Sequence, residues 1–87
     1  MMKEEIFLLL VAESTHLIIK TETLLKENEI SVRIIPLPTE ISGSCGLSIK
    51  FEIKDLEIVK ELLTSNKILL EIYKIRKSGI KKVIDKI

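Results

Sequence analysis

Cys45 is the only cysteine in the 87-residue chain, and its thiol is the side chain best suited to covalent chemistry. The thiolate form of cysteine is a strong nucleophile. Both prolines and two of the three glycines fall between Pro36 and Gly46, which predicts that Cys45 lies on a loop. Its neighbours are small and polar: Ser42, Gly43, Ser44 and Gly46. We expect Cys45 to react, with Ser44 and Gly46 shaping access to the sulfur.

A structural role for Cys45 is the alternative. A free cysteine at the start of a strand can be a small core residue, although the small polar neighbours argue against deep burial. One cysteine cannot form a disulfide within the chain, so nothing indicates an oxidising compartment.

Ser14, Thr15 and His16 are the second group of candidate residues, because either hydroxyl could cap a helix that begins here. His16, the only histidine, could donate a hydrogen bond or a proton to a nearby sulfur. The better supported interpretation is a solvent-exposed helical stripe made of His16, Lys20, Thr23 and Glu27.

The hydrophobic pattern predicts the elements that must position these residues. Strands are expected at Ile6–Ala12, Ser31–Pro36, Leu47–Ile53 and Leu69–Ile75, and helices after Ser14 or Thr15 and after Asp55. A short C-terminal helix is expected after Ser78, with an apolar stripe of Ile80, Val83, Ile84 and Ile87. The fold class is therefore α+β, a ferredoxin-like split β-α-β-β-α-β arrangement with a short C-terminal helical tail. Residues 1–76 would form the domain and residues 77–87 a basic amphipathic tail.

This topology predicts the surroundings of Cys45. Right-handed crossovers place the start of the first helix and the Leu37–Cys45 loop at the same end of the sheet. Counting back from Leu47 in steps of two puts Cys45 on the helix-covered side of its strand. Its sulfur should then face the N-terminus of the first helix, which lowers the pKa of a cysteine.

The face of the sheet without helices needs a cover. The run Ile6–Ala12 is apolar on both faces, and Leu69, Tyr73 and Ile75 are expected to extend the bare patch. Either the tail helix folds over it or a second copy does, and we favour a homodimer through this bare face.

Composition and charge exclude several function classes. The net charge is +1, but residues 74–87 carry six cations and one acidic residue, a net of +5, which leaves −4 on the remainder and suggests docking by the tail. With 3% aromatic residues and no Trp, nucleic-acid binding is not expected. No zinc ligand set, phosphate loop, cofactor motif or acid–base pair is found, so no metal, no cofactor and no enzymatic activity are predicted. The apolar run near the N-terminus is too short for a membrane span or signal peptide, which predicts a cytoplasmic protein with no membrane contact.

The stretch from Ile34 to Leu47, IIPLPTEISGSCGL, and Ser14-Thr15-His16 with Glu22 downstream resemble a small prokaryotic family of selenium/sulfur carrier-like proteins. The family pattern reads roughly S-T-H … E … I-P-x-P-R-E-I-S-S-S-C-G-L. Thr39 stands where the family usually has Arg, and Gly43 where it usually has Ser. The resemblance runs from about Ile6 to Ile75 and leaves the tail out.

The resemblance implies that Cys45 carries sulfur or selenium as a persulfide or selenopersulfide, between donor and acceptor proteins. The first helix's N-terminus, with Ser14, Thr15 and His16, would tune the sulfur. The alternative is a regulatory or protein-interaction module in which Cys45 is structural or senses redox state. The sequence does not distinguish sulfur from selenium.

Overall fold

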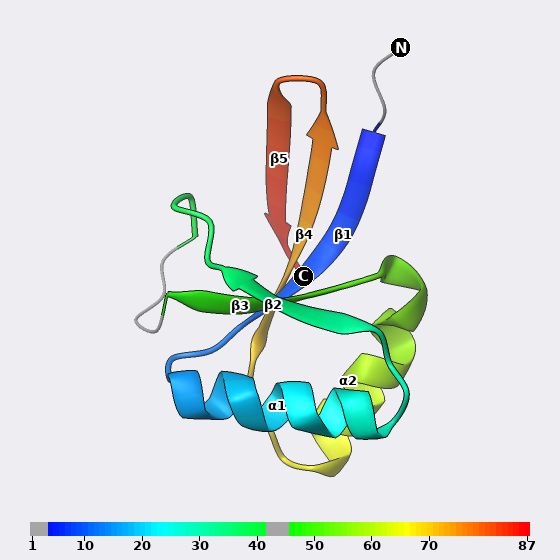
Figure 1. The fold of residues 1–87 in the computed structure, drawn as a ribbon. Helices are drawn as coiled ribbons and strands as arrows, with labels where there is room; N and C mark the ends of the chain where they lie inside the picture. Colours follow the sequence, from blue (N-terminus) through cyan, green and yellow to red (C-terminus); the bar gives the residue numbers. More distant parts are fainter. Residues whose placement is uncertain (1–3, 42–45) are drawn as a thin grey trace.

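The structure, a computed structural model, describes residues 4–41 and 46–87. Two helices lie on one side of a five-stranded antiparallel sheet with the order β2-β3-β1-β4-β5 (Figure 1). The strands are β1 (Glu4–Val11), β2 (Val32–Pro36), β3 (Leu47–Phe51), β4 (Glu71–Ser78) and β5 (Lys81–Lys86). The helices are α1 (Thr15–Glu27) and α2 (Leu56–Ser65), and a 3-10 turn, η1 (Ile53–Asp55), precedes α2. The predicted α+β class is confirmed.

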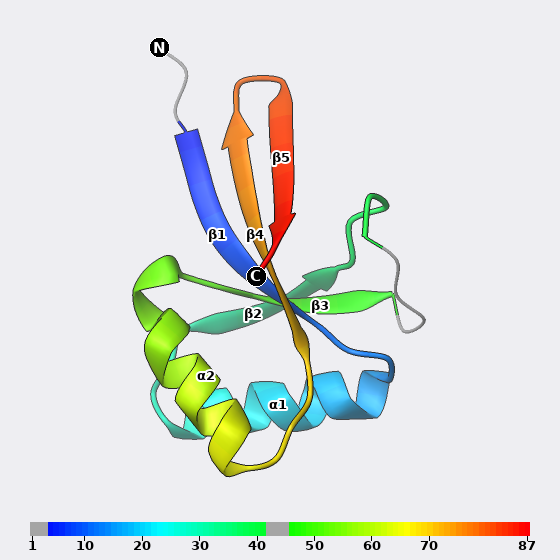
Figure 2. The same cartoon turned by 180° about the vertical axis from the view of Figure 1, so that it is seen from behind.

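The sheet turns strongly along its length. β2 and β3 run across the two helices, whereas the first half of β1 rises away from the helices with β4 and β5 (Figures 1 and 2). β3 pairs with β1 only from Leu8 to Val11, while β4 pairs with β1 along its whole length. The part of β1 before Leu8 therefore belongs to a three-stranded projection made by β1, β4 and β5.

β1 is apolar on both faces because each face contributes to a separate hydrophobic cluster. Leu8 and Leu10 lie on the helix side, where they pack with buried residues of α1 and α2 such as Ile18 and Val59. On the other side lies a second cluster, which we call the open-face cluster: Phe7, Leu9, Val11, Ile41 and Ile75. The prediction that this strand is buried on both faces is confirmed.

The two helices end in the same way. The sequence Leu-Leu-x-x-Asn-x-Ile occurs at Leu24–Ile30 and again at Leu62–Ile68. In each copy the Asn side chain donates to a carbonyl one turn earlier at 2.8 Å. The next residue has positive φ, 61° at Glu29 and 55° at Lys67, and the Ile amide then bonds back to a helix carbonyl. This ending satisfies carbonyl groups that a helix terminus leaves free.

The predicted C-terminal helix is wrong, because the tail is a strand. β4 continues to Ser78, the chain turns at Gly79 with φ 60°, and β5 then pairs with Tyr73–Ser78. The four expected stripe residues have a spacing that suits one face of a helix, but Val83 and Ile84 are β-branched and favour a strand. A glycine that adopts positive φ is the usual requirement of a two-residue hairpin turn. Residues 77–87 thus continue the sheet rather than leave it.

The face without helices is covered by the chain itself. Ile41, which is 5% exposed, packs against the open-face cluster from the segment that follows β2. Ile35, Leu37, Tyr73 and Ile84 pack around it. Of the predicted patch residues, Ile75 belongs to this cluster and Tyr73 packs against it, whereas Leu69 is 92% exposed and does neither. The tail contributes Ile84 as part of a strand rather than of a helix.

Candidate functional site

Cys45 and Ser44 lie outside the described residues, together with Ser42 and Gly43. The structure describes both ends of this segment. We call the preceding residues Leu37–Ile41 the arm, and Gly46 follows the segment. The framework of the candidate site therefore consists of the arm, Gly46 and the start of α1.

A hydrogen bond closes the base of the loop. Pro36 and Leu47 are the last register pair of β2 and β3, and immediately beyond them the amide of Leu37 donates to the carbonyl of Gly46 at 2.9 Å. The loop therefore leaves β2 and enters β3 at neighbouring positions of the sheet.

Gly46 is exposed and has φ 72°, in the left-handed region. A Cβ atom there would meet nothing within 4 Å, so glycine is needed for its backbone conformation and not for lack of room. The same φ value affects the prediction for Cys45. Alternation of side chains between two faces holds only in extended backbone, and it stops at Gly46. A count in steps of two from Leu47 therefore does not reach Cys45.

The start of α1 lies at the same end of the sheet as Gly46. Val11, the last residue of β1, is paired with Ser48 near the start of β3. Figures 1 and 2 agree that the first turn of α1 and the start of β3 lie on the same side of the molecule. This juxtaposition, predicted from the topology, is present.

Ser14 is the N-cap of α1. Its side-chain oxygen accepts a hydrogen bond from the amide of Leu17 at 3.2 Å, and its carbonyl accepts one from the amide of Ile18, also at 3.2 Å. The positive end of the α1 dipole is therefore directed toward this end of the sheet. Thr15 and His16 are both exposed in the first turn.

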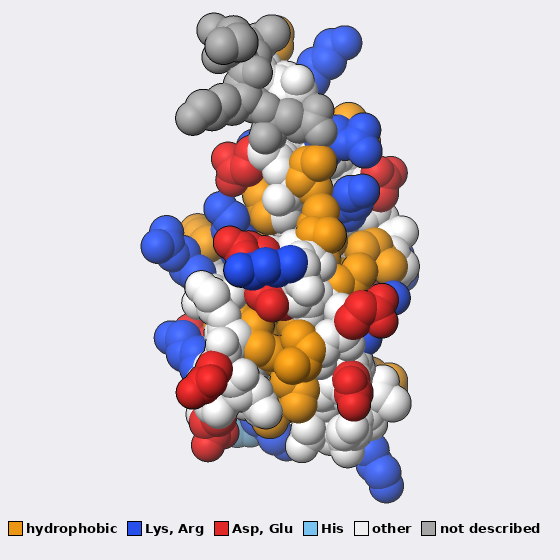
Figure 3. Space-filling view, turned by 90° about the vertical axis from the view of Figure 1, so that its right-hand side faces the viewer, with side chains coloured by type: hydrophobic (Ala, Val, Ile, Leu, Met, Phe, Trp, Pro, Cys, Tyr) orange, Lys and Arg blue, Asp and Glu red, His pale blue; other side chains and the backbone are white. Residues whose placement is uncertain are grey.

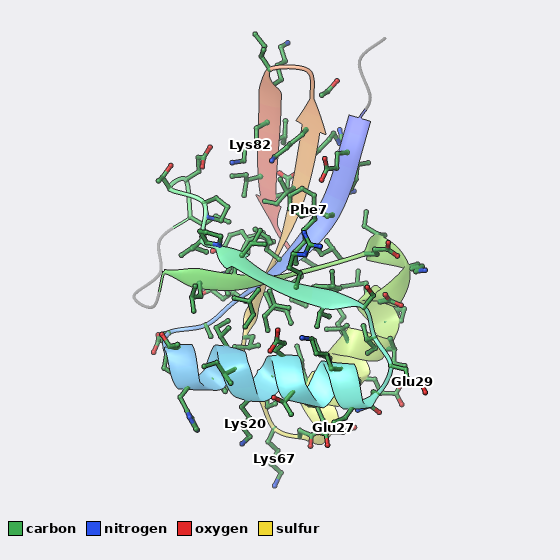
Figure 4. The ribbon with its side chains drawn as sticks, viewed as in Figure 1. Phe7, Lys20, Glu27, Glu29, Lys67 and Lys82 are labelled. Carbon is green, nitrogen blue, oxygen red and sulfur yellow. The ribbon has the colours of Figure 1, made fainter. Side chains whose placement is uncertain are left out.

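His16 belongs to the exposed stripe predicted for α1, together with Lys20, Thr23 and Glu27. Figure 4 shows Lys20 and Glu27 directed away from the sheet. Among the described residues, no hydrogen bond connects His16 to the arm or to Gly46. The structure brings Ser14, Thr15, His16 and Gly46 to the same end of the sheet.

Three residues that sequence reasoning missed hold the arm in place: Glu40, Ile41 and Lys82. The amide of Ile41 donates to the carbonyl of Pro38 at 3.0 Å, which forms a turn and directs Ile41 into the open-face cluster. Glu40 forms an ion pair with Lys82 of β5, with 3.3 Å between Nζ and Oε2. Figure 4 places Lys82 on the side of β5 that the arm approaches.

The pKa of Glu40 is lowered below its ordinary value. Its own backbone amide, which bonds to the carboxylate, is the largest cause, and Lys82 is the next. Thr39 also donates to Glu40, with 3.4 Å between Oγ1 and Oε1. Thr39 thus contacts the residue that links the arm to β5. The signal in the sequence was the apolar Ile41 between two polar residues, Glu40 and Ser42.

Phe7 lies under two lysines on the open face. The Nζ atom of Lys50 is 4.5 Å from the centre of the ring, and that of Lys77 is 5.6 Å away. Lys50 also pairs with Glu5 at 3.2 Å. A shallow hollow of 340 Å³ next to these residues is lined by Ser31, Val32 and Phe51. Because those residues lie at the opposite end of β2 and β3 from Gly46, the hollow is separate from the candidate site.

Within residues 4–41 and 46–87, no three His, Cys, Asp or Glu side chains lie close enough together to hold a metal ion. Neither of the two helices found there has the length and apolar character to cross a bilayer.

The comparisons with known proteins identify a family. The family described as "Putative Se/S carrier protein-like" matches residues 7–74. No curated protein and no solved structure matches the chain. The match extends from β1 into β4, includes Cys45, and leaves β5 outside. Since it covers well over half of the chain, the protein belongs to this Se/S carrier-like family.

Proposed function

We propose that the protein carries sulfur or selenium on Cys45 and passes it between a donor and an acceptor protein, without catalysing a reaction of its own. The observation that carries the proposal is the family match over residues 7–74, which includes the whole loop between β2 and β3. Homodimerisation through the open face is not part of the proposal, because Ile41 and its neighbours already cover that face.

The loading step needs no oxidant or reductant. The Cys45 thiolate attacks the terminal sulfur of a persulfide on the donor, Enz–S–SH. The sulfur–sulfur bond of the donor breaks, Enz–S⁻ leaves as a thiolate, and Cys45 becomes the new persulfide. Selenium would follow the same route from Enz–S–SeH. The acceptor would later remove the terminal atom, and Cys45 would return to a thiolate.

Three features of the described residues support this chemistry. The loop starts and ends at the hydrogen-bonded pair Leu37 and Gly46, so its base is fixed by the sheet. The capped N-terminus of α1 lies at the same end, where its dipole favours an anion such as a thiolate. Gly46, next to Cys45 in sequence, is exposed and carries no side chain that could obstruct a partner.

Mass spectrometry tests the proposal. The protein is incubated with a cysteine desulfurase and cysteine, and the peptide that contains Cys45 should gain the mass of one sulfur atom. Cys45→Ser should gain none. Absence of the mass gain while the desulfurase forms its own persulfide would contradict the proposal.

Alkylation separates the carrier from the regulatory alternative. The rate of iodoacetamide labelling is measured against pH on the folded protein. A carrier thiol should titrate below the ordinary pKa of cysteine, about 8.5. A thiol that titrates at that value or above, or that is not labelled until the protein unfolds, would favour a structural Cys45.

A further inference from the structure

β5 is an edge strand with one free side. Among the strands of residues 4–41 and 46–87, its only neighbour is β4. The amide of Ile87, just after β5, donates to the carbonyl of Ile72 at 2.9 Å. Hydrogen-bonded pairs alternate along an antiparallel ladder, so Lys81, Val83 and Asp85 bond to β4. The amide and carbonyl groups of Lys82, Ile84 and Lys86 therefore face outward along the free edge.

Lysines normally protect an exposed edge from pairing with another strand. Here the two lysines of β5 on the open face already have partners within the molecule. Lys82 pairs with Glu40 at 3.3 Å, and Lys86 pairs with Glu71 at 3.2 Å. Their charge is compensated, so they oppose the approach of another strand less than free lysines would.

The side chains of Lys81, Val83 and Asp85 lie on the opposite face of β5. Val83 is 46% exposed and lies across from Arg76, whose other neighbour in the sheet is Ile6, 38% exposed. The helices do not cover this part of the sheet, because the projection rises away from them (Figures 1 and 2). On the side that carries β1 and α2, hydrophobic side chains reach the surface between charged ones (Figure 3).

We propose that β5 pairs antiparallel with β5 of a second copy of this chain, centred on Val83. In this register Val83 lies opposite Val83 of the partner subunit. Lys81 lies opposite Asp85 of the partner subunit, and the second such pair follows by symmetry. The outward-facing groups of Lys82 and Ile84 then hydrogen-bond across the interface, and the two sheets become continuous.

Charge selects this register over the next one. A two-fold axis perpendicular to the sheet pairs residues whose side chains lie on the same face. The residue on this axis pairs with its own copy, so the register next to the Val83 register has Ile84 on the axis. Centring on Ile84 would place Lys82 opposite Lys86 of the partner subunit twice, and opposed like charges destabilise a strand pair. Only the Val83 register gives two opposite-charge pairs and an apolar centre.

The inference is independent of the proposed function. β5 lies outside the family match over residues 7–74, so the pairing is a property of the tail of this chain. Its interface also differs from the open face through which the sequence predicted a dimer.

Charge exchange tests the pairing. The molar mass of the full chain is measured by sedimentation equilibrium over a range of concentrations, and a dimer is expected. Lys81→Glu places an acidic residue opposite Asp85 of the partner subunit in both pairs. Asp85→Lys places a lysine opposite Lys81 of the partner subunit in both pairs. Each substitution should raise the dimer dissociation constant by at least about five-fold, and high salt should reduce the effect.

An equimolar mixture of the two single variants is the decisive sample, because both cross-strand pairs of the mixed dimer then join opposite charges. The mixture, and the double variant Lys81→Glu/Asp85→Lys, should dimerise nearly as well as the natural chain. Asp85 lies across from Lys74, so thermal unfolding is followed for each variant to establish that it is folded at the temperature used. A monomeric natural chain, a dimer indifferent to both substitutions, or folded variants whose mixture stays monomeric would each overturn the proposal.

Discussion

The side chains of Glu40 and Lys82 lie 42 residues apart in the chain and meet with 3.3 Å between Oε2 and Nζ. This contact joins the arm, which leads to Cys45, to β5, the last strand of the sheet. Ile41 of the arm is a member of the open-face cluster, and Ile84 of β5 packs against that cluster. The ion pair and this cluster thus connect the start of the loop with the tail.

Glu40→Gln should loosen the arm without unfolding the protein. The ion pair is partly exposed, at 51% for Glu40 and 30% for Lys82, so we expect a modest effect. Amide hydrogen exchange of Thr39, Glu40 and Ile41 should accelerate by less than about five-fold, and salt should accelerate it in the natural protein. Glu52→Gln removes the exposed Lys54 pair elsewhere and serves as the control. Equal effects of the two substitutions on the arm would contradict the prediction.

The same contact should depend on pH in the acid range. The pKa of Glu40 is lowered, chiefly by the hydrogen bond from its own amide and then by Lys82. A carboxylate with a lowered pKa stabilises the folded state above its unfolded-state pKa, and this contribution is lost as the pH falls through the folded-state value. The protection factors of the arm amides, which are their exchange rates corrected for the intrinsic dependence of exchange on pH, should therefore fall on acidification in the natural protein. They should change less with pH in Glu40→Gln, and an identical pH profile of the protection factors would contradict this account.

Tyr73 provides a titration in the alkaline range, and it is the only tyrosine of the chain. Its hydroxyl donates to Oε2 of Glu71 at 2.7 Å, and this bond is the main reason why its pKa is raised. The phenolate absorbance should therefore titrate above the ordinary value, and Glu71→Gln should lower the pKa. A group with a raised pKa stabilises the fold below its unfolded-state pKa, and that contribution is lost as the pH rises through the folded-state value. If Glu71→Gln left the titration unchanged, the hydrogen bond would not be the cause.

Gly46→Ala should cost about 1–2 kcal/mol of unfolding free energy, because alanine is strained at a φ of 72°. Gly46→Asn should cost less, since asparagine tolerates the left-handed region better. No atom lies within 4 Å of the added Cβ, so crowding makes no contribution. Urea unfolding followed by circular dichroism measures both variants. Equal costs for alanine and asparagine would show that backbone strain does not decide this position.

Thr21→Val should stabilise the protein. Thr21 is fully buried, and its hydroxyl has no hydrogen-bond partner. Valine has nearly the same shape without the desolvated hydroxyl, so unfolding free energy should rise by about 1 kcal/mol. Thr23→Val is the matched control, because its exposed hydroxyl donates to the carbonyl of Ile19 at 3.1 Å. If Thr23→Val raised the free energy of unfolding as much as Thr21→Val, the effect would not come from burial of the Thr21 hydroxyl.

The elements with a clear hydrophobic period could be predicted from the sequence. The doubly apolar β1 and the cap at Ser14 followed from local patterns, and so did the exposed stripe that contains His16. The tail could not be predicted in the same way, because the spacing of its apolar residues suits a helix whereas the β-branched Val83 and Ile84 favour a strand. Gly79 was the discriminating residue, and its positive φ becomes meaningful only when β4 reaches Ser78.

The surroundings of the loop depended on contacts distant in sequence. Burial of Ile41 requires Phe7, Leu9 and Ile75, which come from two other strands, so its local pattern does not show the surface against which it packs. The expected direction of the Cys45 side chain relied on an extended backbone that ends at Gly46. The juxtaposition of α1 with this end of the sheet was nevertheless correct, because β1 and β2 both run antiparallel to β3 and therefore end on the same side of the sheet.

The family match stops at residue 74, before the strand that supplies Lys82 and Ile84. A relative whose chain ended there would keep the arm and the cysteine but would lose the ion pair between Glu40 and Lys82 and the packing of Ile84 against the open-face cluster. Members of one family could then differ in how tightly the approach to the same thiol is held, according to the C-terminal segment that each adds to the common core.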